Sequence, residues 1–321
     1  MDALAMLSPF TLDVLLMILV IVVKMLLTAL NPHQPMRLFN LYCQRLADKV
    51  NKPSNSANQQ QLAGVLALVI SVTPILIITW LFEDFVLVPE LWQAFILYIC
   101  LGGVGIFTAS KNIAKQLTAN QKYEAKESLK PFVLRETSNL SSLGLTKATI
   151  ETQALTLSQQ LIGVCFYFLL LGPVGMLMYR LSLEAHYAWN TKQPTFVAFG
   201  KGVASWSNLL QYLPNRLFAL CLLLTTVGQN ALLNWRLSIG YFFQANNSVL
   251  LNLLALSLGC KLGGVAMYQG EKIRKTAFND HGKQPEVTDI IHASARLKQA
   301  LILCAIVLVI TVIFANLTIS K

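Results

Sequence analysis

Three arginines offer the chemistry that stands out first in this sequence. Arg37 follows the first apolar run, Arg135 stands beside Glu136 in a polar stretch, and Arg216 lies in a polar segment flanked by hydrophobic ones. A guanidinium group binds phosphate or carboxylate through paired N–H groups, so all three are candidates for holding an anionic ligand. Each also has a structural interpretation: a loop anchor for Arg37, a local ion pair for Arg135, and a side chain reaching the membrane interface for Arg216.

Generic motifs assign no activity. The six cysteines contain no CxxC pair, the four histidines have no metal-ligand spacing, and the sequence has no P-loop, GxGxxG, GxSxG or HExxH. Glu151 precedes an apolar run. It is either a magnesium ligand or a negative charge that favours a helix N-terminus.

The composition indicates a membrane protein. Of the 321 residues, 55% are hydrophobic and 12% are charged, and the mean hydropathy is +0.56. Soluble domains carry about 25% charged residues. Because backbone groups in lipid must be paired within their own segment, we expect an all-α, polytopic membrane protein with a single membrane domain. The expected spans lie near residues 11–30, 62–82, 91–109, 155–179, 249–268 and 300–317.

Charge is distributed unevenly between the polar loops. Loops 31–61, 110–152 and 270–298 are rich in Lys and Arg, whereas loop 83–90 contains acids and no basic residue. The positive-inside rule makes the basic loops cytoplasmic, which predicts a multi-pass protein of the bacterial inner membrane. The net charge of +10 therefore indicates anchoring in a lipid bilayer, with no nucleic-acid partner.

One stretch conflicts with a simple count of crossings. If 110–152 and 270–298 lie on the same side, an even number of crossings separates them, yet three apolar candidates occur there. Residues 203–228 contain Gln211, Pro214 and Arg216 in their first half. We expect a half-inserted or broken helix there, facing an internal cavity, and the alternative is an amphipathic surface helix.

Several motifs, in order along the chain, match those of a family of membrane enzymes. Residues 35–38 are similar to the motif H-P-V-R, 135–140 to R-D-T-S-x-L, 150–152 to V-E-T, 211–217 to N-Y-L-P-A-R-L, 262–271 to L-G-G…Y-x-G-E and 289–296 to D-I-S-R…R-L. These are motifs of the CobD/CbiB family, the membrane-bound adenosylcobinamide-phosphate synthases of cobalamin biosynthesis. Because the matches are collinear and cover nearly the whole chain, the sequence resembles a divergent member of this superfamily.

The resemblance implies ATP-dependent formation of an amide between adenosylcobyric acid, a corrinoid, and an aminopropanol phosphate. ATP and magnesium are the implied cofactors. The residues that the resemblance leaves for substrate or phosphate are Arg37, Arg135, Tyr212, Arg216 and Tyr268, and those left for the metal are Glu151 and Glu271.

The family's acidic residues are replaced in this chain. Leu155 and Gln159 stand where the family motif A-E-N-T-V-D-G has Glu and Asp, and His186 stands where N-T-L-D-S-M has Asp. Ser207-Asn208 replaces an Asp pair. Because neutral side chains bind magnesium far more weakly than carboxylates, we expect an eroded metal site and a poor or inactive synthase.

Two other functions stay open at this stage. AmpE-like membrane proteins resemble the same superfamily, lack much of the acidic signature, and serve as accessory components linked to β-lactamase regulation. A transporter of small solutes or corrinoids, built around residues 203–217, is the second; Asp13 and Lys24 within the first span favour it. A homo- or hetero-oligomer in which a partner supplies the missing carboxylates is also open.

Overall fold

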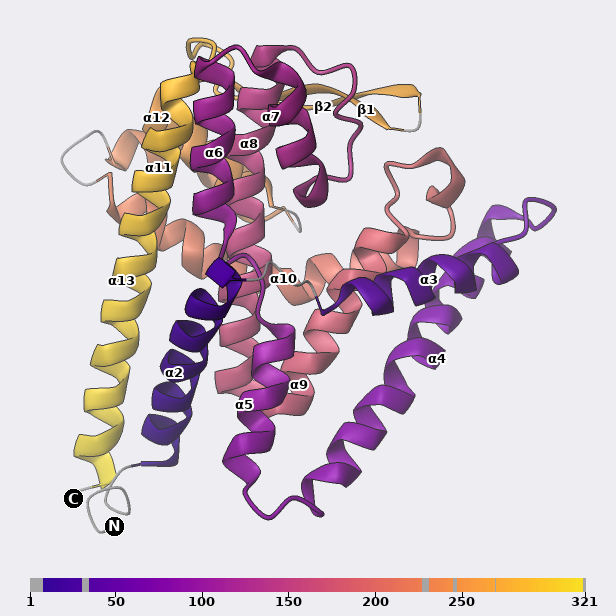
Figure 1. Ribbon diagram of the computed structural model, residues 1–321, viewed down its shortest axis with the longest axis vertical. Helices are drawn as coiled ribbons and strands as arrows, with labels where there is room; N and C mark the ends of the chain where they lie inside the picture. Colours follow the sequence, from indigo (N-terminus) through magenta and orange to yellow (C-terminus); the bar gives the residue numbers. More distant parts are fainter. Residues whose placement is uncertain (1–7, 31–34, 227–230, 245–246, 269, 320–321) are drawn as a thin grey trace.

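The computed structural model describes residues 8–30, 35–226, 231–244, 247–268 and 270–319 and is mostly helical (Figure 1). The helices are α2 (Pro9–Leu30), α3 (Arg37–Val50), α4 (Ala57–Glu83), α5 (Pro89–Cys100), α6 (Ile106–Thr118), α7 (Lys122–Leu129), α8 (Ser142–Thr156), α9 (Gly163–Ala188), α10 (Lys201–Leu224), α11 (Ala231–Phe242), α12 (Ser248–Leu258) and α13 (Val287–Ile319). A π-helix, Leu157–Ile162, joins α8 to α9, and short 3₁₀ turns lie at Lys130–Phe132 and Pro194–Phe196. The strands are β1 (Leu262–Tyr268) and β2 (Glu271–Phe278).

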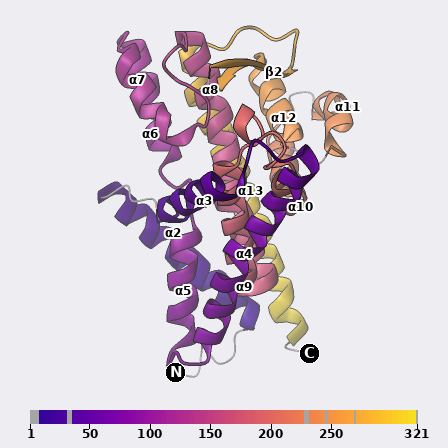
Figure 2. The same ribbon diagram turned by 90° about the vertical axis from the view of Figure 1, so that its right-hand side faces the viewer.

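The expected helical membrane fold is confirmed. Within the described residues, four helical stretches are long and apolar enough to cross a membrane: Pro9–Leu27, Ala57–Glu83, Ser142–Ala188 and Val287–Leu317. Figures 1 and 2 show α6, α7, α8, α12 and the β-hairpin gathered at the end of the molecule opposite to the chain termini.

The stretch Ser142–Ala188 reverses its direction in the middle. Gly172 has φ +67° and ψ −165°, which interrupts α9, and Pro173 follows it. The hydroxyl of Tyr179 donates to the carbonyl of Gln159 at 2.8 Å, although a straight helix would separate these two residues by about 30 Å. The stretch 155–179, expected as a single span, is therefore not one straight helix. The chain forms a helical hairpin that reverses at Gly172.

Helix α10 is continuous, so the expected break near 203–228 is wrong. Pro214 has no N–H, which leaves the carbonyl of Leu210 without its helical donor. The hydroxyl of Tyr167, on the descending arm of α9, donates to that carbonyl at 2.8 Å and replaces the missing bond. The polar side chains of Ser207 and Gln211 are buried in the protein, so the polar half of α10 avoids lipid without breaking.

The expected span at 249–268 is also wrong. Helix α12 ends at Leu258, because Gly259 adopts the left-handed conformation at φ +63°. Residues 262–268 instead form β1, which pairs antiparallel with β2. The expected span at 91–109 is divided between α5 and α6 by an irregular segment in which Gly103 has φ +75°.

Two hydrophobic cores hold the helices together. One packs α2, α3, α4, α5 and α9 around residues such as Leu97 and Met176. The other packs α6, α8, α10, α12 and α13 around residues such as Leu145 and Phe218. Leu161 packs against both cores, so the π-helix lies at their junction.

The hydrogen bond from the Tyr167 hydroxyl to the Leu210 carbonyl should contribute to the stability of the fold. The substitution Tyr167→Phe leaves a buried carbonyl without a donor, and we expect the free energy of unfolding to fall by about 1–3 kcal/mol. Unfolding of the detergent-solubilised protein measures this. Tyr123→Phe is the matched control because Tyr123 is exposed; equal stability of the two variants would contradict the assignment.

Candidate functional site

A buried ion pair joins two of the stretches that resemble family motifs, 135–140 and 150–152. Arg135 Nη2 lies 3.0 Å from Glu151 Oε2, and the two side chains are only 9% and 8% exposed. The other carboxylate oxygen of Glu151 accepts the backbone N–H of Gly263 at 2.9 Å. One carboxylate therefore connects the loop before α8, α8 itself and strand β1.

The segment around Glu136 extends this connection along the β-hairpin. The backbone N–H of Glu136 donates to the carbonyl of Met267 at 3.1 Å, and its side chain accepts the N–H of Gly270 at 2.7 Å. Gly263 has φ +74°, and an added Cβ would lie 2.1 Å from the carbonyl oxygen of Thr276. Gly263 is thus required by close backbone approach, whereas Gly264 has open space around it and is favoured by its φ of +98°.

Tyr268 completes the group, which we name the Arg135 cluster: Arg135, Glu151 and Tyr268. Burial raises the pKa of the Tyr268 phenol, and the positive charges of Lys192 and Arg135 act against that shift. The phenol therefore stays neutral and remains a hydrogen-bond donor near pH 7. Lys147 also lies within electrostatic range of Glu151, whereas its neighbour Lys261 forms an ion pair with Asp280.

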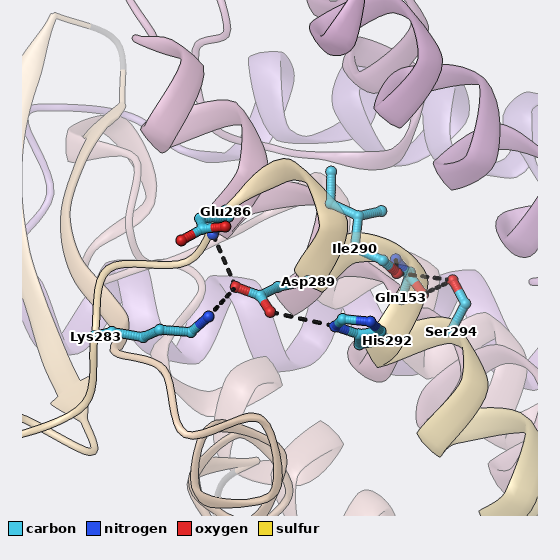
Figure 3. A network of polar contacts seen from close by, with 7 residues as sticks. All are labelled: Gln153, Lys283, Glu286, Asp289, Ile290, His292 and Ser294. Atoms are coloured by element: carbon cyan, nitrogen blue, oxygen red, sulfur yellow. Dashed lines mark hydrogen bonds and ion pairs between the residues drawn. The ribbon is translucent and has the colours of Figure 1, made fainter.

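Asp289 organises the start of α13 (Figure 3). Its Oδ2 accepts the backbone N–H of Glu286 at 2.8 Å and lies 3.9 Å from Lys283 Nζ, while Oδ1 lies 3.5 Å from His292 Nδ1. The side chain is 4% exposed. This carboxylate caps the start of α13 and contacts the side chains of Lys283 and His292.

Gln153, which the sequence did not single out, ties α8 to α13 beside this corner (Figure 3). Its amide donates to the carbonyl of Ile290 at 3.3 Å and accepts from the Ser294 hydroxyl at 2.7 Å. Its place in the polar E-T-Q step of an otherwise apolar region was the available signal.

Arg216 and Tyr212 lie together on α10, and the hydrogen bonds of Arg216 lead to the end of α11. The guanidinium carbon sits 4.1 Å from the centre of the Tyr212 ring. Arg216 Nε donates to the carbonyl of Phe242 at 3.0 Å, and Nη2 donates to the carbonyl of Gln244. Arg216 therefore binds the backbone after α11.

The two remaining predicted site residues are exposed. Arg37 begins α3 and Glu271 begins β2, directly opposite Tyr268 in the strand register. The predicted residues that the structure brings into one buried group are thus the three of the Arg135 cluster.

Gln159 stands where the family motif carries an Asp, and it lies in a network of neutral side chains. Gln159 Nε2 donates to Gln211 Oε1 at 2.6 Å, and the Tyr187 hydroxyl donates to Gln159 Oε1 at 2.6 Å. Gln211 Nε2 donates to Ser207 Oγ at 2.7 Å. A π-helix interrupts the regular backbone here, a feature common at functional sites.

Asn215 extends this amide network toward α12. Its Nδ2 donates to Ser158 Oγ at 3.2 Å and to Asn247 Oδ1 at 2.8 Å, and Asn247 in turn donates to Gln211 at 3.2 Å. The network therefore joins α10, the π-helix and the start of α12 without any ionised group.

The described residues offer a magnesium ion few carboxylates. Magnesium at an ATP site is usually held in near-octahedral geometry by one or two protein carboxylates together with phosphate oxygens and water. Among the described residues, no three His, Cys, Asp or Glu side chains lie close enough to hold a metal. Both oxygens of Glu151 already have partners, one of them cationic.

Comparison with known proteins points to one family. A family profile described as "CobD/Cbib protein" matches residues 14–297. The relative named cobalamin biosynthesis protein CobD of Stutzerimonas stutzeri is 29% identical over 251 residues, which cover 78% of this chain and 82% of that protein.

Two further relatives carry related names. CobD of Chromobacterium violaceum is 28% identical and covers 66% of this chain and 68% of its own length. CbiB of Salmonella arizonae is 29% identical, with coverage of 71% and 69%. No solved structure matches the chain.

Removing only one charge of the ion pair between Arg135 and Glu151 should destabilise the protein more than removing both. Glu151→Gln leaves Arg135 buried without a countercharge, and we expect the free energy of unfolding to fall by about 3–5 kcal/mol. The double variant Arg135→Met/Glu151→Leu should recover much of that loss, because it removes both buried charges.

Chemical or thermal unfolding in detergent checks this. Glu127→Gln is the control: its pair with Lys130 is 51% and 66% exposed, and such pairs contribute about 0–1 kcal/mol. A Glu151→Gln variant as stable as the control would refute the structural role of this pair.

Proposed function

Because the chain belongs to the CobD/CbiB family, we propose that it serves cobalamin biosynthesis by holding an anionic corrinoid intermediate at the Arg135 cluster. We further propose that, alone, it does not carry out the ATP- and magnesium-dependent amide formation. The observation that carries this is the environment of Glu151. Its carboxylate is bound by Arg135 and by the N–H of Gly263, while Leu155, one helical turn further on, is neutral.

The electrostatics of the cluster support an anionic ligand. Arg135 and Lys147 interact with the carboxylate of Glu151, and Lys192 acts on Tyr268, while Lys261 is paired with Asp280. Corrin propionates and phosphate esters carry the complementary charge, and guanidinium and ammonium groups bind both. A neutral Tyr268 phenol adds a donor that does not change the charge balance.

The loss of catalysis follows from the amide network. Transfer of a phosphoryl group from ATP needs magnesium to neutralise developing charge. Where the family motif has an Asp, this chain has Gln159, whose side chain bonds to Gln211 and to the Tyr187 hydroxyl. Amides paired in this way offer few free oxygens to a metal.

We propose that the protein is a multi-pass component of the bacterial inner membrane with its basic side in the cytoplasm. Strand β1, α6, α7 and the start of α13 lie at the end opposite to the start of α2 and the end of α13 (Figure 1). A hairpin 142–188 that re-enters from this side keeps residues 110–152 and 270–298 together, as the positive-inside rule requires.

Complementation tests the proposed loss of activity. A synthase-null bacterium expressing this chain is grown with cobyric acid, with a cobinamide-fed culture as the growth control and the Salmonella arizonae CbiB protein as the comparison. We expect growth on cobinamide and none on cobyric acid, with the protein detected in the membrane fraction. Growth on cobyric acid would establish the enzyme and direct the search for metal ligands to Glu151, Glu184 and Glu271.

A further inference from the structure

A buried arginine on the returning arm of α9 has hydrogen-bond donors without acceptors. Arg180 Nη2 lies 2.7 Å from Glu184 Oε1, and its side chain is 6% exposed. Its Nε and Nη1 atoms find no hydrogen-bond partner among the described residues. Buried donors of this kind are rare in native proteins and each needs an explanation.

A second buried cation lies beside it. Lys24, on α2, is 5% exposed. Its ammonium donates to the carbonyl of Tyr98 at 2.6 Å and sits 4.2 Å from the Tyr98 ring centre. Both are neutral partners, so neither cancels the charge. Lys24 and Arg180 lie close enough for their charges to interact.

The charges around this point leave a positive excess. Lys24 and Arg180 supply two positive charges, and Glu184 supplies one negative charge. The remaining polar neighbours are uncharged: Tyr179 and Tyr187 lie within electrostatic range of Arg180, and the amide of Asn40 on α3 lies 3.5 Å from Glu184 Oε2. Asn40 is only half-buried, so the surface lies one side chain away from the pair.

We propose that Arg180 and Lys24 form a buried oxyanion site that takes one monoanionic phosphate or carboxylate group. A water molecule could satisfy the free N–H groups of Arg180, but it could not compensate the charge. An uncompensated charge in an apolar interior is strongly unfavourable, whereas an oxyanion both pairs the donors and neutralises the excess. Guanidinium with ammonium is the combination that binds such groups.

The site is separate from the Arg135 cluster in its contacts and does not rest on the proposed function. The same oxyanion chemistry occurs in a free phosphate compound and in the headgroup of an acidic phospholipid. Because the site borders α3 inside the helical membrane part of the molecule, both sources reach it, and the test separates them.

The test uses the full chain in phosphatidylcholine nanodiscs. Equilibrium binding of radiolabelled orthophosphate measures the free anion, and native mass spectrometry after exchange into phosphatidylglycerol measures lipid retention. We expect Arg180→Gln and Lys24→Gln to weaken binding by about tenfold or more, since each removes a charge that contacts the anion. Glu184→Gln should tighten binding, because it removes a competing carboxylate. Lys49→Gln, an exposed charge on α3, is the control.

The opposite effects expected on anion affinity, weaker for Arg180→Gln and Lys24→Gln and tighter for Glu184→Gln, decide the outcome. Saturable orthophosphate binding with this pattern assigns the site to a soluble ligand, and one retained phosphatidylglycerol with this pattern assigns it to a lipid. If wild type binds neither probe, or if binding is the same in all variants, the proposal is overturned. Should Arg180→Gln fail to fold, the contrast between Lys24→Gln and Glu184→Gln carries the same decision.

Discussion

The carboxylate of Glu151 is the group that holds together α8, the loop before it and the β-hairpin. It lies on α8, binds Arg135 from the preceding loop, and accepts the N–H of Gly263 at the start of the β-hairpin. Because the Arg135 and Glu151 side chains are only 9% and 8% exposed, leaving either charge unpaired would cost several kcal/mol. Together with the contacts of Glu136 to Met267 and Gly270, this pair holds the β-hairpin against α8.

The apolar surroundings impose a second constraint, namely that polar groups in the helical interior must be paired. The chain meets it with uncharged side chains around the π-helix, where Gln159 and Gln211 bond to each other. Burying neutral amides costs far less than burying carboxylates that lack a cation. The replacement of acids by amides therefore preserves the packing of α9 and α10 while removing the groups that a metal-dependent reaction would need.

Composition and motif order predicted the helical membrane fold and the residues of the Arg135 cluster, but not the course of the chain. Apolar content marks a helix in lipid and says nothing of its direction, so the reversal at Gly172 was missed; the Gly172-Pro173 pair was the available signal. The β-hairpin was missed because β1 continues an apolar run, although Gly263-Gly264 marked the change. Arg216 was expected to bind a ligand, yet it binds the carbonyls after α11, a tertiary contact that no local pattern encodes.

We propose that the candidate site keeps the cation Arg135 but, with Leu155 and Gln159 in place of acids, lacks carboxylates that would hold magnesium. The most direct measurement is the electron paramagnetic resonance titration of Mn²⁺, a substitute for magnesium, into the purified protein in nanodiscs in the presence of ATP. Wild type should leave the spectrum of free Mn²⁺–ATP unchanged, whereas Leu155→Glu/Gln159→Asp, which restores two carboxylates of the family motif, should gain a bound signal. Stoichiometric binding of Mn²⁺ by the wild-type protein would contradict the account.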